Sequence, residues 1–143
     1  MNAGDIVREL YSTLEAQQFD KALSMLTDDF TFSGATPQPL NKQQWIGVIR
    51  AMKAAIPDWS FGYKGTKVDG DYVEGTVSIT GTQTGTLNLP MPGMQPIPAT
   101  GKKVAGPTEK VELTVLGAQV ASLAVENVPG GGVPGIVAQL NAQ

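Results

Sequence analysis

The sequence of 143 residues divides into a helical first part and a sheet-forming second part, and this order strongly limits the fold. Up to residue 56, apolar residues recur at helical spacing. The helical positions are Ile6, Val7, Leu10, Tyr11 and Leu14, then Phe19, Ala22, Leu23 and Leu26, then Trp45, Val48, Ile49, Met52 and Ile56. We expect three helices, the first and third capped by Asn2 and Asn41, and a short strand at 30–33 between the second and third helices.

From residue 59 onward, apolar and polar residues alternate, which is typical of strands with one buried face. We expect strands at 59–64, 73–80, 111–115 and 120–128, with turns at Asp69-Gly70-Asp71 and Gly117. The last strand is apolar on both parities, so we expect both of its faces to be covered. A short helix should follow Pro134. The chain is predicted to be one domain, residues 1–143.

A proline- and glycine-rich segment, residues 85–107, interrupts the predicted sheet. It is longer than the usual connection in a compact domain, which favours a rim, lid or interface role. The alternative is an extended hairpin whose apolar residues cover the edge of the core. These residues are Leu87, Leu89, Met91, Met94 and Ile97.

Charge and composition exclude several classes of function. The net charge is −3, from 10 basic and 13 acidic residues, and there is no run of Lys or Arg, so we expect no nucleic-acid partner. We expect no membrane segment, because no apolar stretch is long enough to span a bilayer, and no signal peptide. The absence of cysteine fits a reducing compartment, and we predict a cytoplasmic location.

The chain also contains no histidine. Without histidine and cysteine, Cys–His and Ser–His nucleophile pairs, histidine acid–base catalysis and most zinc, iron and copper sites are excluded. The paired aspartates at 28–29 and 69/71 lack the spacing of a calcium loop. We therefore predict no metal and no cofactor, and catalysis would have to use carboxylate, Lys, Tyr or Arg.

Three short segments carry a resemblance to a known family. They are Gly81-Thr82-Gln83-Thr84-Gly85, Ala99-Thr100-Gly101-Lys102-Lys103-Val104 and Gly135-Ile136-Val137-Ala138-Gln139-Leu140-Asn141. In this order they resemble the Gly-Thr-His-Thr-Gly, Thr-Gly-Lys-Arg-Val and Gly-Leu-Leu-x-Gln-Leu-Gly segments of SnoaL-like polyketide cyclases and their ester-cyclase relatives. The order of helices and strands resembles the nuclear transport factor 2-like, cystatin-like α+β architecture.

The resemblance implies a cone-shaped barrel, in which a highly curved antiparallel or mixed sheet wraps around three N-terminal helices, plus a short C-terminal helix. It implies a small apolar ligand with a carbonyl group inside the cone. The implied chemistry is aldol-type cyclisation or isomerisation, driven by removal of a proton next to the carbonyl. Two positions differ from the family: Gln83 stands where the family has histidine, and Glu126 is the residue that could supply the family's carboxylate.

The candidate catalytic residues are Gln83, Glu109 and Glu126. Strand alternation directs Gln83 to the buried face, where it would orient a ligand carbonyl, unless it bonds to backbone or water at a strand end. Glu109 shares parity with Val111, so burial would raise its pKa and suit it as a base; alternatively, it lies in solvent at the start of the strand. Glu126 would act as a base or face a subunit partner.

The candidate ligand-binding residues are mostly aromatic. They are Tyr11, Phe32, Trp45, Trp59, Tyr63 and Asn127. In a hollow fold such aromatic residues form cavity walls, whereas in a filled fold they are plain core.

Three functions stay open on the sequence alone. An enzyme predicts an inward carboxylate beside a ligand-sized cavity, and a binding module predicts an aromatic cavity with Gln83 and no buried carboxylate. An interaction scaffold predicts a filled interior. The apolar pattern of the last strand predicts a homodimer through the outer face of the sheet.

Overall fold

A computed structural model of the chain describes residues 2–34, 36, 38–90 and 95–141. Four helices lie in these ranges: α1 (Ala3–Glu15), α2 (Phe19–Ser24), α3 (Lys42–Ala55) and α4 (Gly132–Asn141). Both predicted asparagine N-caps are confirmed. Asn2 Oδ1 accepts a hydrogen bond from Asp5 N at 2.9 Å and Asn41 Oδ1 accepts one from Gln44 N at 2.8 Å, each within a capping box.

The main sheet has five strands in the order β1-β7-β6-β3-β2, with β1 parallel to β7 and the other neighbours antiparallel. The strands are β1 (Leu26–Ser33), β2 (Lys64–Asp69), β3 (Tyr72–Val77), β6 (Glu109–Leu116) and β7 (Gln119–Val125). The predicted α+β fold with a mixed sheet is confirmed. Across the described ranges no ladder joins the edge strands β1 and β2, so the sheet is open rather than a closed barrel.

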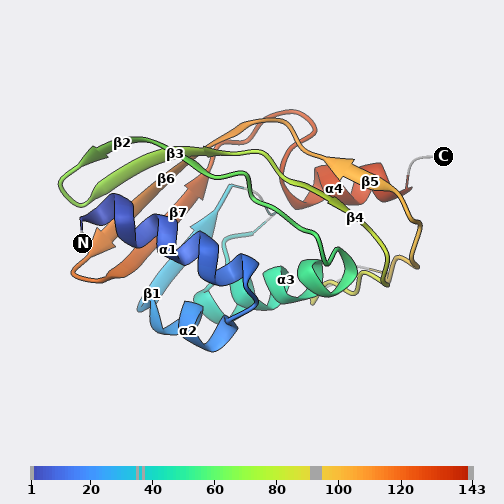
Figure 1. The fold of residues 1–143 in the computed structure, drawn as a ribbon, viewed down its shortest axis with the longest axis horizontal. Coiled ribbons are helices and arrows are strands. Elements are labelled where there is room, and N and C mark those ends of the chain that lie inside the picture. Colours follow the sequence, from blue (N-terminus) through green and yellow to red (C-terminus); the bar gives the residue numbers. More distant parts are fainter. Residues whose placement is uncertain (1, 35, 37, 91–94, 142–143) are drawn as a thin grey trace.

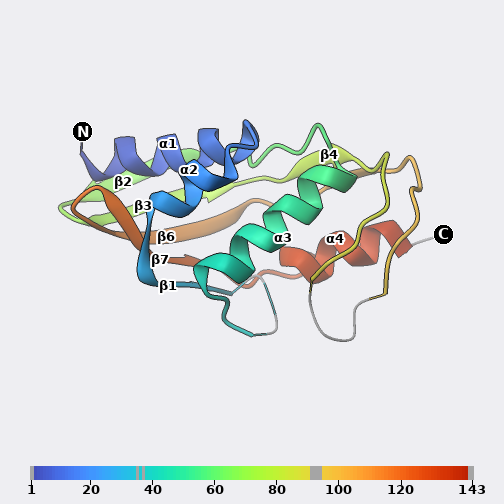
Figure 2. The same cartoon turned by 90° about the horizontal axis from the view of Figure 1, so that it is seen from below.

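A second, two-stranded ladder extends the sheet toward the other end of the molecule (Figure 1). It pairs β4 (Thr80–Thr82) with β5 (Lys103–Ala105), which continue the chain directions of β3 and β6 beyond a break in each strand. The helix α4 lies beside β5, at the end of the molecule that carries the C-terminus (Figure 2). Helix α4 therefore lies at the opposite end of the molecule from the start of α1 (Figure 1).

The helices α1 and α3 cover one face of the main sheet (Figures 1 and 2). Helix α1 contacts β2, β3, β6 and β7, whereas α3 contacts β1. The sheet residues beneath them are buried and apolar: Val73, Val77, Val111, Leu113, Val115, Val120 and Leu123. Burial of this face against the helices supplies the hydrophobic core.

A β-bulge explains why β7 is apolar on both parities. Leu123 pairs with Leu113, but Val120 pairs with Val115, so the register shifts between these pairs. The shift brings Val120 and Leu123 to the same inner face, where both are buried. The bulge therefore accounts for apolar residues on both parities of β7 without a cover on the outer face, where Ala124 is exposed in the single chain.

The outer face of the sheet carries charged side chains. Lys110 Nζ lies 3.1 Å from Glu74 Oε1 and 3.4 Å from Glu112 Oε1, which joins β3 and β6 across that face. These ion pairs are at least partly exposed, so each contributes little to stability.

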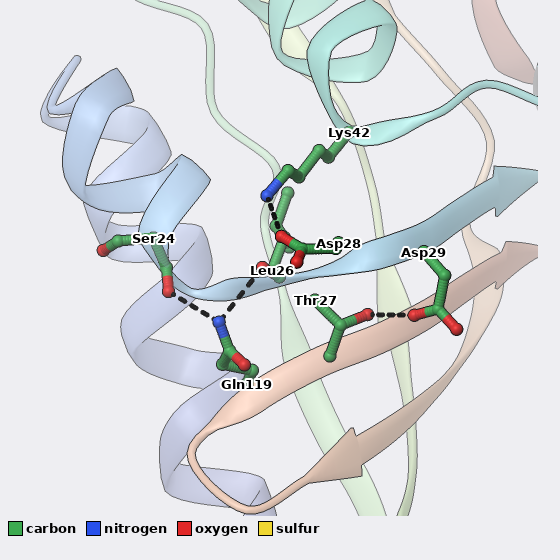
Figure 3. Close-up of polar contacts among 7 residues, drawn as sticks. All are labelled: Ser24, Leu26, Thr27, Asp28, Asp29, Lys42 and Gln119. Carbon is green, nitrogen blue, oxygen red and sulfur yellow. Dashed lines mark hydrogen bonds and ion pairs between the residues drawn. The ribbon is translucent and has the colours of Figure 1, made fainter.

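The strand β1 begins at Leu26, four residues earlier than predicted. Its register against β7 shifts between Leu26 and Thr31, which leaves Asp28 and Asp29 exposed on an irregular stretch. Lys42 Nζ lies 3.2 Å from Asp28 Oδ1, and Thr27 Oγ1 donates a hydrogen bond to Asp29 Oδ1 at 2.8 Å (Figure 3). Helix α2 ends at Ser24, so Leu26, which was expected on the helix, is the first residue of β1, and the two aspartates lie inside this strand.

The predicted strand at 59–64 is wrong. Only Ser60 forms a bridge, to Thr80, and β2 starts at Lys64. Gly62 has a φ of 56°, and a Cβ at this position would lie 2.8 Å from Ser78 O, so the chain bends where a strand would continue. The aromatic residues on either side consequently pack inward without forming a ladder.

The segment 85–107 matches the extended-hairpin alternative. Leu87 and Ile97 form an antiparallel bridge with hydrogen bonds of 2.9 Å in both directions, and these two residues and Leu89 are buried. Met91 and Met94, which were expected in the same apolar set, lie outside the described residues.

Candidate functional site

A cavity lies between α1, α3, the inner face of the sheet and α4. It encloses about 690 Å³ when the part open to solvent is counted, and about 70 Å³ of this admits the centre of a water-sized sphere. One water needs roughly 10–15 Å³ by the second measure, so the space accommodates several water-sized groups. This size suits a compact small molecule.

Aromatic side chains form much of the cavity wall. Phe32 stacks on Trp45 with ring centres 5.4 Å apart, and Phe61 meets Tyr11 at 5.0 Å and Trp59 at 5.7 Å in edge-to-face contacts. These contacts fix the rings in place, so the wall is preformed. Four of the predicted ligand-binding aromatics, Tyr11, Phe32, Trp45 and Trp59, therefore meet at one cavity.

Tyr63, the fifth predicted aromatic, lies behind the wall. Its ring stacks on Tyr11 with centres 4.6 Å apart, and it is half-buried. Within the part of the chain that the structure describes, Tyr63 Oη and Trp59 Nε1 are buried atoms without a hydrogen-bond partner. Tyr63 thus supports the position of Tyr11 rather than lining the space itself.

Glu109 is the carboxylate of the cavity wall. It is the first residue of β6, pairs with Val77 of β3, and its side chain faces inward with 4% of the residue exposed. The alternative that Glu109 lies in solvent at the start of the strand is wrong. Burial raises the pKa of its carboxyl above the ordinary 4.5, although a hydrogen bond from Gly132 N to Oε1 at 3.3 Å acts in the opposite direction.

Tyr11 brings a hydroxyl group to the same cavity from α1. Tyr11 and Glu109 line the same cavity, from α1 and β6 respectively. Burial raises the pKa of this phenol, and the electrostatic influence of Tyr63 (once ionised) and of the Glu109 carboxylate adds to the rise. Tyr11 therefore remains a protonated hydrogen-bond donor at neutral pH.

Gln83 is buried, as predicted, but it is not part of the cavity wall. Its Nε2 donates to Ile97 O at 3.0 Å and Pro98 O at 3.2 Å, and its Oε1 accepts from Thr100 N at 3.1 Å and Thr100 Oγ1 at 2.6 Å. These four bonds use the hydrogen-bonding capacity of the amide within the chain. The predicted role of Gln83 in orienting a ligand therefore has no geometric support.

Glu126 and Asn127 are exposed and do not line the cavity. Glu126 borders a shallow hollow on the outer face of the sheet together with Lys110 and Glu112. Leu123 and Val125 line the cavity, and by alternation the next residue, Glu126, lies on the side of the outer hollow and away from the cavity. The geometry therefore does not support the expectation that Glu126 acts as the base and that Asn127 contacts a ligand in the cavity.

The helix α4 completes the wall, and this role was not predicted from the sequence. Gly132, Val133 and Ile136 line the cavity from this helix. The signal in the sequence was the glycine run at 130–132 directly before an apolar helix, because such a run lets the chain pass close to other groups. A Cβ at Gly131 would lie 3.0 Å from the Glu109 carboxyl carbon.

The three segments that carry the family resemblance contact one another. Gln83 binds Thr100 through its side chain, Lys102 Nζ donates to Leu140 O at 3.3 Å, and Gln139 bonds to Ala105, which follows the second segment. The hydrogen bonds among these segments therefore form a structural frame around the β4–β5 ladder and α4. The polar side chains of the cavity, Tyr11 and Glu109, lie outside the three segments.

Two further properties concern metals and membranes. Among the described residues, no group of three or more acidic side chains is placed to hold a metal ion. In the same ranges, no helix has the length and hydropathy needed to cross a bilayer.

The fold is a cystatin-like α+β fold with a cavity that is partly open to solvent. Residues 7–109 match the SnoaL-like domain, and the chain belongs to this family. No curated protein sequence matches it.

Solved structures share the fold at low sequence identity. The chain is similar to a proposed polyketide cyclase of Xanthomonas campestris, with 15% identity, a TM-score of 0.72, and coverage of 97% of this chain and 96% of that chain. It is similar to AclR, a proposed hydroxylase of Streptomyces galilaeus, with 14% identity, a TM-score of 0.72, and coverage of 96% and 80%. An uncharacterized cystatin-fold protein of Novosphingobium aromaticivorans has 16% identity, a TM-score of 0.61, and coverage of 87% and 97%. Because a proposed cyclase and a proposed hydroxylase share this fold, the fold alone does not decide the reaction.

Proposed function

We propose that this protein binds a small apolar ligand with a carbonyl group and removes a proton from the carbon next to that carbonyl. Glu109 is the proposed base. The observation that carries this proposal is a carboxylate, 4% exposed, on the wall of an otherwise apolar and aromatic cavity. A carboxylate whose pKa is raised by burial is a stronger base than one in water, which suits weak carbon acids.

Tyr11 is the proposed donor to the carbonyl oxygen. When Glu109 accepts the proton, the electron pair of the C–H bond forms a C=C bond and the carbonyl oxygen becomes negative. A hydroxyl that donates to this oxygen stabilises the transition state more than the ground state. Tyr11 suits this role because it lines the same cavity and burial keeps its phenol protonated.

Two reactions can follow the enolate. Glu109 can return the proton to a different carbon, which isomerises the ligand, or the enolate carbon can attack a second carbonyl of the same ligand, which closes a ring. The family to which the chain belongs and the name of the Xanthomonas relative favour the ring closure. Both reactions share the first step, so the first step is the one to test.

Exchange of α-protons in D₂O tests this step without knowledge of the natural ligand. The probes are small apolar ketones of increasing size, from cyclohexanone to 1-tetralone, and exchange is followed by proton NMR. We expect the protein to accelerate exchange of at least one of them, and Glu109→Gln to reduce the acceleration by at least about 100-fold. Glu126→Gln is the matched control, because it removes an exposed carboxylate that lies outside the cavity.

The same experiment separates the alternatives. Binding of a ketone without accelerated exchange would favour a binding module that holds such ligands without reacting them. Neither binding nor exchange across the series would contradict the proposal. Equal exchange rates for the wild-type protein and Glu109→Gln would exclude Glu109 as the base.

A further inference from the structure

The helix α4 is held to the sheet by a pair of hydrogen bonds from one side chain. Gln139 Oε1 accepts from Ala105 N at 3.0 Å, and Gln139 Nε2 donates to Ala105 O at 3.0 Å. The amide thus bonds to the edge of β5 as a neighbouring strand would. Lys102 Nζ adds a bond to Leu140 O at the C-terminal end of α4.

The opposite end of α4 contacts the proposed base. Gly132 N donates to Glu109 Oε1 at 3.3 Å, and Val133 and Ile136 cover the cavity beside it. Gly130 and Gly132 have φ values of 77° and 69°, so the chain reaches this position through a left-handed backbone that favours glycine. The environment of Glu109 therefore depends on α4 lying where it does.

We propose that Gln139 is a positioning residue for Glu109: by holding α4 against β5, it keeps water away from the carboxylate and keeps Gly132 N within reach of it. The contacts of Gln139 and Glu109 do not depend on the proposed function; only the catalytic consequence of holding Glu109 in place rests on it. Gln139 does not line the cavity and is not expected to touch a ligand.

Release of α4 would change the hydration of Glu109 without removing a charged side chain from its surroundings. Helix α4, residues 132–141, contains no Asp, Glu, Lys or Arg, and Tyr11 is the titratable group whose pKa responds to Glu109. Entry of water would lower the pKa of Glu109, whereas loss of the bond from Gly132 N would raise it. Burial is the larger influence on this carboxyl, so the net effect is a lower pKa, closer to 4.5.

The test compares Gln139→Met with Gln119→Met. The first keeps the side-chain length and removes both bonds to Ala105. The second also removes two side-chain bonds, to Ser24 O and Leu26 O, both at 3.2 Å, which tie the start of β7 to the chain at the start of β1 (Figure 3). The measurement is a carbon-13 NMR titration of the Glu109 carboxyl, assigned by its disappearance in Glu109→Gln.

We expect the titration midpoint of Glu109 to fall toward 4.5 in Gln139→Met and to stay unchanged in Gln119→Met. Amide hydrogen exchange of α4 should become at least about 10-fold faster in Gln139→Met, whereas exchange in β6 and β7 should not change. An unchanged midpoint in Gln139→Met would overturn the proposal. An equal shift in both variants would overturn it as well, because it would indicate a general loss of stability.

A second variant covers the case in which Gln139→Met does not fold. Gln139→Glu keeps the bond from Ala105 N and loses the donation to Ala105 O, so it should give a midpoint between those of the wild type and 4.5. A wild-type midpoint in this variant would then count against the proposal. These readouts require no turnover, so failure of the ketone exchange test and failure of this inference are separate results.

Discussion

Glu109 lies directly opposite Val77 in the antiparallel pairing of β6 and β3, so an acidic residue shares the inner face of the sheet with a valine. The side chain of Glu109 therefore points away from the exposed outer face of the sheet, and the residue is buried. Its hydrogen bond comes from the main chain at the start of α4. The chemistry proposed for this protein follows from that placement.

The first prediction concerns pH and stability. Because burial raises the pKa of Glu109 above 4.5 in the folded state, the folded protein binds this proton more tightly than the unfolded chain. The contribution of Glu109 to the free energy of unfolding is fully present below about pH 4.5 and is lost as the pH rises through the raised pKa. Glu109→Gln should therefore be more stable than wild type at pH 7, by about 1 kcal/mol.

Urea denaturation between pH 4 and pH 8 measures this difference. The difference between the two proteins should grow with pH from about pH 4.5 upward, and Glu126→Gln should follow the wild type throughout. A Glu109→Gln variant that is less stable than wild type at pH 7 would show that burial of the charged carboxylate does not lower the free energy of unfolding.

The second prediction concerns Gln83. Gln83→Ala removes a fully buried side chain and its four hydrogen bonds; Pro98 O and Thr100 N lose the partner that the amide gives them, whereas Ile97 O keeps its bond from Leu87 N. The loss of these bonds together with the space left in a buried position should lower the free energy of unfolding by about 3 kcal/mol. Denaturation by urea gives the value.

Gln119→Ala is the matched control for Gln83→Ala. It also removes two bonds to main-chain oxygens, but Gln119 is exposed and water replaces them, so we expect a loss below about 1 kcal/mol. Equal losses for the two variants would show that Gln83 has no special structural role.

The sequence predicted the order of helices and strands because hydrophobic periodicity reports which face of an element is buried. It predicted Tyr11, Phe32, Trp45 and Trp59 at one cavity for the same reason. Alternation failed where the backbone is irregular. The bulge in β7 moved Val120 to the inner face, and the left-handed Gly62 ended the strand expected at 59–64.

The catalytic candidates show a second limit. Strand alternation correctly predicted that both Gln83 and Glu109 face inward, but it could not show that only Glu109 lines the cavity. Gln83 is enclosed by a loop that returns to it 14 to 17 residues later, and only the folded chain shows this contact. Glu109 meets the cavity because α4, far along the chain, closes beside it.

The third prediction separates two tyrosine hydroxyls. Tyr11→Phe keeps the ring that stacks on Tyr63 and removes the proposed donor, so ketone exchange should slow by about 100-fold or more. Tyr63→Phe removes a buried hydroxyl that has no partner among the described residues, so exchange should not change and stability should stay equal or rise slightly. Equal exchange rates for Tyr11→Phe and wild type would exclude the donor role of Tyr11.

The fourth prediction tests the location of the ligand. Val133→Phe adds a ring to the side of α4 that lines the cavity, so binding of the best ketone should weaken by at least about 10-fold. Val137→Phe adds the same ring to the same helix at a position outside the lining and should bind normally. Affinity is read from NMR shift changes on titration, and normal binding to Val133→Phe would place the ligand elsewhere.

The most direct test compares two midpoints in one sample of wild-type protein. One is the pH midpoint of ketone exchange, and the other is the titration midpoint of the Glu109 carboxyl carbon. If Glu109 is the base, the two coincide, lie above 4.5, and the rate increases with pH. An exchange rate that does not depend on pH in this range, or a midpoint that differs from that of Glu109, would contradict the account.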